Sequence, residues 1–443
     1  MDAAHRRAAL GVLLAGAALA TGWVVAGASR APEPGVNPAP VRLVRPAARP
    51  LSEMARLGRE MFFDSSLSRS GTLACATCHD PAHAYGPPDG TMRRSAAADG
   101  ERVARAVPGL RYADRVPPFS IGPDAGVEDQ VRPAPASAAP TARGPKLAGM
   151  AAAAPSLVPR GGLFWDGRAG SLQRQALGPL FNPQEMANRD TAALAGRLRR
   201  RYGARLAALV GPQTVADARA LVYEVAFAVA RFETEDASFH PYSSKYDAYL
   251  EGRARLTAAE ARGLAAFEDP SRGNCAGCHL DRPDAEGHPP PFTDYEYEAL
   301  GAPRNASLPS NRDSLAYDLG LCGPARIDLR ATTRYCGMFR TPSLRNAATR
   351  RVFFHNGVFH SLEEVLAFYA LRDARPDALY SRGPDGRVRR FDDLPAAYRS
   401  NVDTADPPFG RRLGAGGALS GQDRRDIIAF LETLTDGYRG AGR

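Results

Sequence analysis

The sequence predicts a mainly α-helical fold with two related halves in tandem, and three observations support that prediction. Apolar residues recur near the helical period in several long segments. The alternation of apolar and polar residues that marks a half-buried strand is scarce. One sequence pattern occurs twice, which in a chain of 443 residues fits a tandem arrangement of domains. The segments with the clearest helical period are 191–210, 216–233, 361–371 and 423–434.

The repeated pattern couples a predicted helix to a cysteine motif. Residues 51–64 (LSEMARLGREMFFD) and 256–269 (LTAAEARGLAAFED) both place a Phe four residues, and an Asp six residues, after a glycine. A Cys-x-x-Cys-His motif follows each of them, at 75–79 and at 275–279. We therefore expect two related domains, each opening with a helix that leads into its motif. The predicted domain ranges are 51–250 and 251–443.

Each motif has the composition of a covalent haem c site. Its two thiols can bond to the porphyrin vinyl groups, and the adjacent histidine can ligate the iron. A structural zinc site or a redox dithiol is the alternative, but zinc needs one tetrahedral ligand set and the two cysteine pairs lie 200 residues apart. We expect two cytochrome c-like haem domains, with His79 and His279 as iron ligands. The predicted haem-attachment residues are Cys75, Cys78, His79, Cys275, Cys278 and His279.

The N-terminus is predicted to direct the chain out of the cytoplasm. Arg6 and Arg7 precede the apolar stretch 8–28, which ends in small residues as a secretory signal does. The stretch has about 20 residues and is also long enough for an uncleaved membrane anchor. We therefore interpret 1–28 as a signal peptide or N-terminal anchor and 29–50 as a Pro-rich linker, and we expect a periplasmic location.

Cys322 and Cys336 are the two cysteines outside the haem motifs. Because an exported protein meets an oxidising compartment, we predict a disulfide between them, with two buried free thiols as the alternative. The net charge of +9 does not indicate a nucleic-acid partner, since the basic residues are dispersed. Their densest run, 197–201, lies on a predicted helix and fits a solvated helix face. A positive surface suits an acidic redox donor.

Longer stretches around and between the two motifs carry a more specific signal. They include LGREMFFDSSLSRSGTLACATCHDPA at 57–82, LFWDGRAGSLQRQALGPLFNPQEMA at 163–187, FRTPSLRN at 339–346, FFHNG at 353–357 and SLEEVLAFY at 361–369. These stretches resemble the bacterial di-haem cytochrome c peroxidases, including their MauG-like branch. The resemblance extends over about 51–438. It implies that the N-terminal haem reacts with peroxide, whereas the C-terminal haem is six-coordinate and stores or relays electrons.

The resemblance also implies a second axial ligand for the C-terminal haem. That ligand lies 14 residues after the histidine of an F-H-x-G motif, and it is methionine in many of these peroxidases and tyrosine in the MauG-like branch. Counting from His355 gives Tyr369. A buried core tyrosine is the alternative reading of Tyr369, and Met338 is the competing ligand. A thioether raises the iron potential, whereas a phenolate lowers it and favours higher oxidation states.

The distal side of the N-terminal haem departs from the family pattern. The family has an acid/base glutamate ten residues after the residue that precedes Phe-Trp-Asp-Gly-Arg. That residue is Leu163 here, and the count ends at Gln173. A glutamine can orient peroxide but cannot shuttle a proton at neutral pH. We predict Gln173 and Arg168 as the catalytic residues. Nearby substitutes, each more often structural, are His83, Asp166 and Glu185.

The family also binds a calcium ion between its haems, through an asparagine side chain and backbone carbonyls. Ala153 stands where the asparagine would be, and the carbonyls align near Arg350 and Val352. The loss of the side-chain ligand weakens the case for Ca²⁺ without removing it.

Three functions remain at this point. The leading one is a periplasmic peroxidase that reduces hydrogen peroxide with electrons from a cytochrome c, a cupredoxin or a similar donor. The second is MauG-like oxidation of side chains in a partner protein, which Tyr369 favours. The third is a non-enzymatic di-haem electron carrier, which the departure at Gln173 favours.

Overall fold

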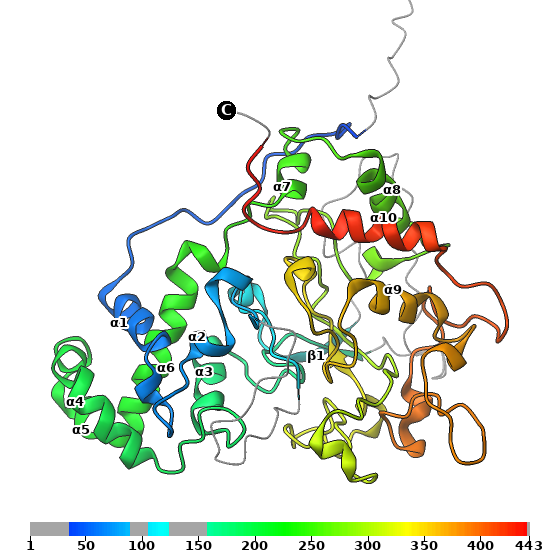
Figure 1. The fold of residues 1–443 in the computed structure, drawn as a ribbon. Coiled ribbons are helices and arrows are strands. Elements are labelled where there is room, and N and C mark those ends of the chain that lie inside the picture. Colours follow the sequence, from blue (N-terminus) through cyan, green and yellow to red (C-terminus); the bar gives the residue numbers. More distant parts are fainter. Residues whose placement is uncertain (1–34, 89–104, 124–156, 441–443) are drawn as a thin grey trace, which may run out of the picture. The chain divides into compact units, whose positions relative to one another are not determined.

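Helices form most of the regular structure, as the sequence predicts, and the strands are short (Figure 1). The computed structural model describes residues 35–88, 105–123 and 157–440. The predicted signal and Ala153 lie outside these ranges. The helices are α1 (Glu53–Phe62), α2 (Cys75–Cys78), α3 (Leu172–Phe181), α4 (Thr191–Val210), α5 (Pro212–Ala216), α6 (Ala218–Glu235), α7 (Lys245–Leu250), α8 (Ala258–Glu268), α9 (Leu362–Leu371) and α10 (Gly421–Glu432).

Capping side chains explain where the long helices begin. The Asp217 carboxylate accepts a hydrogen bond from Ala220 N, which ends α5 and starts α6 two residues later than the apolar period suggests. Ser361 and Ser420 each form a capping box with the acidic residue three positions on, and these boxes start α9 and α10. The four helices predicted from periodicity are therefore present, with ends displaced by two residues or fewer.

The strands form two small antiparallel pairs. β1 (Ser120–Pro123) pairs with β2 (Leu157–Arg160), and Ser120 lies opposite Arg160. β3 (Tyr297–Glu298) pairs with β4 (Phe339–Arg340), so that Tyr297 lies opposite Arg340.

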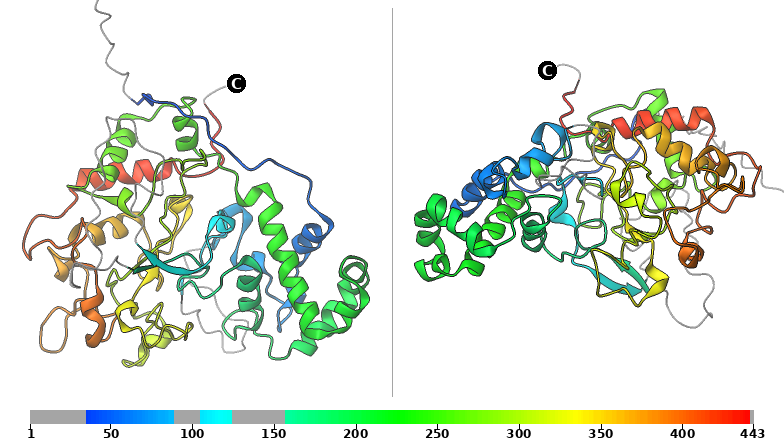
Figure 2. Two further views of the ribbon diagram at one scale, coloured as in Figure 1. Left: turned by 180° about the vertical axis from the view of Figure 1, so that it is seen from behind. Right: turned by 60° about the horizontal axis from the view of Figure 1, so that its bottom comes forward.

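The sequence repeat corresponds to a repeated packing arrangement. In one half α1 lies beside α6, and in the other α8 lies beside α10 (Figures 1 and 2). A Cβ atom on Gly58 would lie 1.8 Å from the Ala228 carbonyl oxygen, and one on Gly263 would lie 1.9 Å from the Asp426 carbonyl oxygen. Glycine is therefore needed where each pair of helices crosses, because any side chain would push the two backbones apart.

The other two repeated residues also have matching roles. Phe62 and Phe267 are both buried, each in the apolar core of its own half. Asp64 accepts a hydrogen bond from Ser66 N, and Asp269 accepts one from Ser271 N, so each aspartate closes the turn after its helix. The chain from Pro34 to Arg443 clusters as one unit, and the domain ranges around residue 250 stay a prediction.

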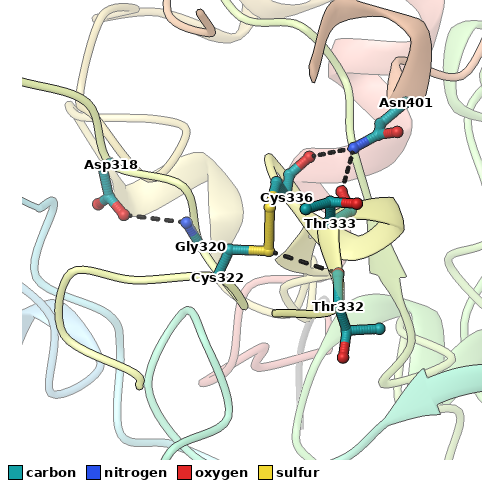
Figure 3. Close-up of a disulfide and its surroundings, with 7 residues drawn as sticks. All are labelled: Asp318, Gly320, Cys322, Thr332, Thr333, Cys336 and Asn401. Carbon is teal, nitrogen blue, oxygen red and sulfur yellow. Dashed lines mark hydrogen bonds between the residues drawn. A yellow bond between two sulfur atoms is a disulfide. The ribbon is translucent and has the colours of Figure 1, made fainter. Parts of the chain in front are cut away.

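A third apolar cluster surrounds the disulfide between Cys322 and Cys336, which confirms that prediction (Figure 3). The Asn401 side-chain amide donates hydrogen bonds to the carbonyls of Thr333 and Cys336, at 2.8 and 3.0 Å. These bonds tie the disulfide segment to the end of η10 (Ala396–Asn401). Within the described ranges, none of the helices has the length and apolar character needed to span a bilayer.

Candidate haem and peroxide sites

The first Cys-x-x-Cys-His motif forms a single helical turn, α2, with His79 as its C-terminal cap. The imidazole Nδ1 lies 3.1 Å from the carbonyl oxygen of Tyr85. A carbonyl can only accept, so Nδ1 carries the proton and the lone pair of Nε2 is left for a metal. Burial lowers the pKa of His79 to about 4, which keeps the ring neutral as metal ligation requires.

The second motif repeats this arrangement within η5 (Cys275–Gly277) and the residues after it. Nδ1 of His279 lies 3.0 Å from the carbonyl oxygen of Phe292, so its Nε2 is also left for a metal. Burial lowers the pKa of His279 as well. The two cysteines of each motif are not joined by a disulfide, as attachment to a porphyrin requires. Both histidines predicted as iron ligands are therefore oriented for that role.

A cavity of about 520 Å³ contains the first motif. Cys75, Cys78 and His79 line it together with side chains from α3, from one face of α6 and from the second half of the chain. A volume of this size lies within the usual range of ligand and cofactor sites. The lining is mainly apolar and includes Trp165, Pro179 and Val229, so a flat, largely apolar macrocycle fits it.

A chain of ion pairs forms the polar wall of this cavity. The Asp166 side chain is fully buried and accepts from Arg168 Nη1 at 2.8 Å and from Arg105 Nη1 at 2.7 Å. Arg105 also pairs with Asp318, at 2.6 and 2.7 Å. The Arg168 guanidinium lies 3.7 Å above the ring of Phe164. The predicted residue Arg168 thus lines the cavity, but Asp166 balances its charge.

The structure does not bring Gln173 into the cavity. Its side-chain amide donates to the Tyr223 carbonyl oxygen on α6, at 3.1 Å, on an exposed part of the surface. Gln175 on the same helix is buried and lines the cavity. Two residues along an α-helix correspond to a rotation of about 200°, so a count along the chain that is out by two selects the opposite helix face.

Glu185 lines the same cavity and bonds to the Asn182 side chain. Burial raises the pKa of the Glu185 carboxyl, which favours its protonated form. His83 is partly exposed, and its Nδ1 lies 2.9 Å from the Asp80 carboxylate in the turn after the first motif. Of the substitutes considered from sequence, Glu185 is therefore the one placed for proton chemistry in the cavity. Glu185 could be named as a candidate from the sequence alone, although its burial could not be predicted from it.

Tyr369 on α9 lies near the second motif. Burial raises the pKa of its hydroxyl, and the thiols of Cys278 and Cys275 raise it further, which shows that these groups are close together. Its ring stacks on Phe409 with 5.6 Å between centroids. Met338, the competing ligand, packs instead against the disulfide cluster. The structure thus brings Tyr369 to the second motif, and ligation by Tyr369 stays a prediction.

The two histidines differ in the charge beside them. The Arg350 guanidinium lowers the pKa of His79, whereas the Asp294 carboxylate raises the pKa of His279. Arg350 donates to the Val107 carbonyl oxygen at 2.8 Å, and no carboxylate in the described part of the chain pairs with it. Burial lowers the pKa of Arg350 to about 10, which still leaves it charged at neutral pH.

Known proteins share this combination of motifs. A family model described as di-haem cytochrome c peroxidase matches residues 52–255. The chain is 32% identical to the methylamine utilization protein MauG of Paracoccus denitrificans, over 90% of this chain and 94% of that protein. The chain belongs to the di-haem cytochrome c peroxidase family. Haem is therefore its expected cofactor, as the residues of both motifs require.

Two further relatives show the range of the family. The crystal structure of the diheme peroxidase BthA from Burkholderia thailandensis is similar with a TM-score of 0.74 and 35% identity, and the match covers 91% of this chain and 94% of that one. The cytochrome c551 peroxidase of Nitrosomonas europaea is 24% identical over 74% of this chain and 75% of its own length. Both peroxidases and MauG proteins are thus relatives of this chain.

Proposed function

We propose that the protein is a periplasmic di-haem peroxidase that reduces hydrogen peroxide with electrons from a small redox protein. The observation that supports this most is the difference between the two motifs. The first opens onto a cavity of about 520 Å³ with polar groups in its wall, whereas the second has a tyrosine beside it. The cavity at one site therefore has polar side chains that could meet a small oxidant beside the haem that it would hold, as an enzyme of this type needs.

Cys75 and Cys78 attach the first haem in this proposal, and Nε2 of His79 ligates its iron. Cys275, Cys278 and His279 do the same for the second haem, which gives tandem haem domains over about 51–250 and 251–443. The iron of a haem supplies the binding of peroxide and the transfer of electrons to it. The export signal at 1–28 and the disulfide are consistent with a periplasmic location.

The cavity residues supply orientation and protons. Glu185, whose carboxyl pKa is raised by burial, can donate a proton from its carboxyl group to the leaving oxygen of peroxide. The Gln175 amide can orient peroxide by donating to one oxygen while its carbonyl accepts from the other. The pairing of Arg168 with Asp166 holds a guanidinium at the wall without adding a net charge to the cavity.

Tyr369 would help to hold a haem on His279 by ligating its iron. A phenolate ligand would favour higher oxidation states, and the haem would then supply a store of oxidising equivalents. A cytochrome c or a cupredoxin would return the electrons, since the family includes cytochrome c551 peroxidases. The net charge of +9 suits an acidic donor surface.

The decisive experiment adds stoichiometric peroxide to the purified holoprotein and records optical and EPR spectra. One high-spin haem that reacts within the mixing time supports the proposal, and two low-spin haems that ignore peroxide contradict it and indicate an electron carrier. Glu185→Gln should slow the reaction by about 10²-fold or more, because general acid catalysis typically contributes that much. Glu364→Gln, which changes an exposed carboxylate on α9, is the matched control.

Oxidation of a partner protein is a second candidate function, and two observations favour it. The chain is 32% identical to a MauG protein over most of its length, and Tyr369 lies beside the second motif. This function predicts that one equivalent of peroxide, added with no reductant present, changes the spectra of both haems and that the changes persist for minutes. Rapid return of both spectra without a donor contradicts it.

A further inference from the structure

Glu233 is a buried acid at the edge of the first cavity that the proposed peroxide chemistry does not use. It lies on the same face of α6 as Val225, Ala226 and Val229, and all four line the cavity. The residue is 3% exposed, and its Oε2 has no hydrogen-bond partner among the described residues. An unpaired carboxylate in such a place is costly, so burial favours the protonated form of Glu233.

Two further ionisable groups lie near Glu233. The field of Asp114, on η3 (Ala113–Arg115), acts on Glu233, and the field of His240, which follows η4 (Ala237–Phe239), acts on Asp114. Asp114 Oδ1 and His240 Nδ1 are buried atoms without a hydrogen-bond partner among the described residues. Both residues are half-buried.

Several charged side chains on α6 and on the elements packed against it are paired with other residues. On α1, Arg56 pairs with Glu53, and Glu60 pairs with Arg205 of α4. Glu235, two residues further along α6, bonds to Ser52 and Arg231. Burial and the negative charge of Asp114 together raise the pKa of Glu233 to about 8. Glu233 can therefore change protonation near neutral pH in response to a new charge in the cavity.

We propose that Glu233 binds a proton when the haem held by His79 is reduced. The inference rests on the proposed function, because it needs a haem in the first cavity. One electron from a donor enters the iron, and one proton from solvent converts the Glu233 carboxylate to a carboxylic acid. No bond to the haem forms or breaks at Glu233.

The physical reason is electrostatic. An added electron is a negative charge within a cavity of low dielectric, and it raises the proton affinity of a nearby carboxylate. The midpoint potential of this haem should then fall with rising pH between the two pKa values of Glu233, one for each oxidation state. Outside that interval the potential should not vary with pH through Glu233.

The experiment is a spectroelectrochemical titration of the holoprotein between pH 6 and pH 10, in which the two haems are followed by their separate optical bands. Glu233→Gln keeps the size and hydrogen-bonding capacity of the side chain and removes the titration. We expect the pH dependence of the first haem around pH 8 to be lost in Glu233→Gln and retained in Glu235→Gln, its matched control on the same helix. The second haem should be unchanged in both variants. An unaltered slope in Glu233→Gln overturns the proposal.

A second variant leaves Glu233 in place and tests its partner. Because the charge of Asp114 raises the pKa of Glu233, Asp114→Asn should move the pH-dependent interval to lower pH. An interval that stays where it is in the wild type overturns the role of Asp114. Infrared difference spectra of the oxidised and reduced protein should contain a protonated carboxyl band that Glu233→Gln removes. A purified wild type without haem on Cys75 and Cys78 contradicts the proposed function itself, an outcome that haem counting separates from the others.

Discussion

The two haem motifs have the same local geometry, yet their surroundings differ. In each motif, a backbone carbonyl fixes the proton of the histidine on Nδ1, and a glycine in the preceding helix allows a close helix crossing. Around His79 there is an open cavity and a buried arginine, whereas around His279 there is a buried aspartate and a tyrosine. The shared local geometry would hold a haem at each motif, and the neighbouring charges and space would set what each haem does.

The charges have opposite expected effects on the two irons. A positive charge near a haem stabilises the reduced state and raises its potential, and a negative charge lowers it. Arg350 should therefore ease reduction of the first haem, while Asp294 and Tyr369 should favour oxidation of the second. This division suits an enzyme in which one iron meets peroxide and the other holds oxidising equivalents.

The largest effect is expected from Tyr369→Phe, because it removes a proposed iron ligand. The low-spin EPR signal of the second haem should be replaced by a high-spin one, and the first haem should be unchanged. Tyr380→Phe is the matched control, since Tyr380 is buried in the same apolar cluster but bonds to the Gly301 carbonyl. If Tyr369→Phe leaves the low-spin signal intact and Met338→Ala removes it, the ligand is the methionine.

The next effect concerns Arg350→Met, which removes the buried charge beside the first site. We expect the midpoint potential of that haem to fall by the equivalent of about 1 to 2 kcal/mol per electron, the scale of a charge at an effective dielectric near 20. Arg351→Met changes the adjacent, exposed arginine and should leave both potentials in place. Equal shifts of the first haem's midpoint potential in the two variants would show that the potential depends on the net charge of the protein and not on the position of Arg350.

The sequence predicts more of this molecule where a property is local. The repeat around Gly58 and Gly263 predicts paired helices before the motifs, and helix periodicity locates α4 to the residue. The direction in which a helical side chain points depends on how the helices pack against one another. A count along the chain therefore selects Gln173, whereas Gln175 lines the cavity. The burial of Glu233 could not be predicted either. It depends on how α6 packs against other segments, including the one that carries Asp114.

A smaller effect is expected from Asp294→Asn near the second motif. Removing the carboxylate charge should raise the midpoint potential of the second haem. The shift should be less than that for Arg350→Met, because Arg340 interacts with Asp294 and already offsets part of its field. The measurement is the same potentiometric titration. An equally large shift in the midpoint potential of the first haem would show that the two sites do not have separate electrostatic environments.

The smallest effect is expected from Gln173→Ala, and it sharpens the comparison on the peroxide side. Gln173 bonds to a backbone carbonyl at the surface, whereas Gln175 lines the cavity. The rate of peroxide consumption by Gln173→Ala should stay within about twofold of the wild type, because the side chain lies away from the cavity. The fold should also be intact, since a surface substitution typically changes stability by no more than about 0.5 kcal/mol. Gln175→Ala should slow the same reaction by tenfold or more, because it removes a donor that can orient peroxide. The reverse order would mean that α3 turns its other face toward the cavity when the haem is bound, and it would restore Gln173 as the residue that meets peroxide.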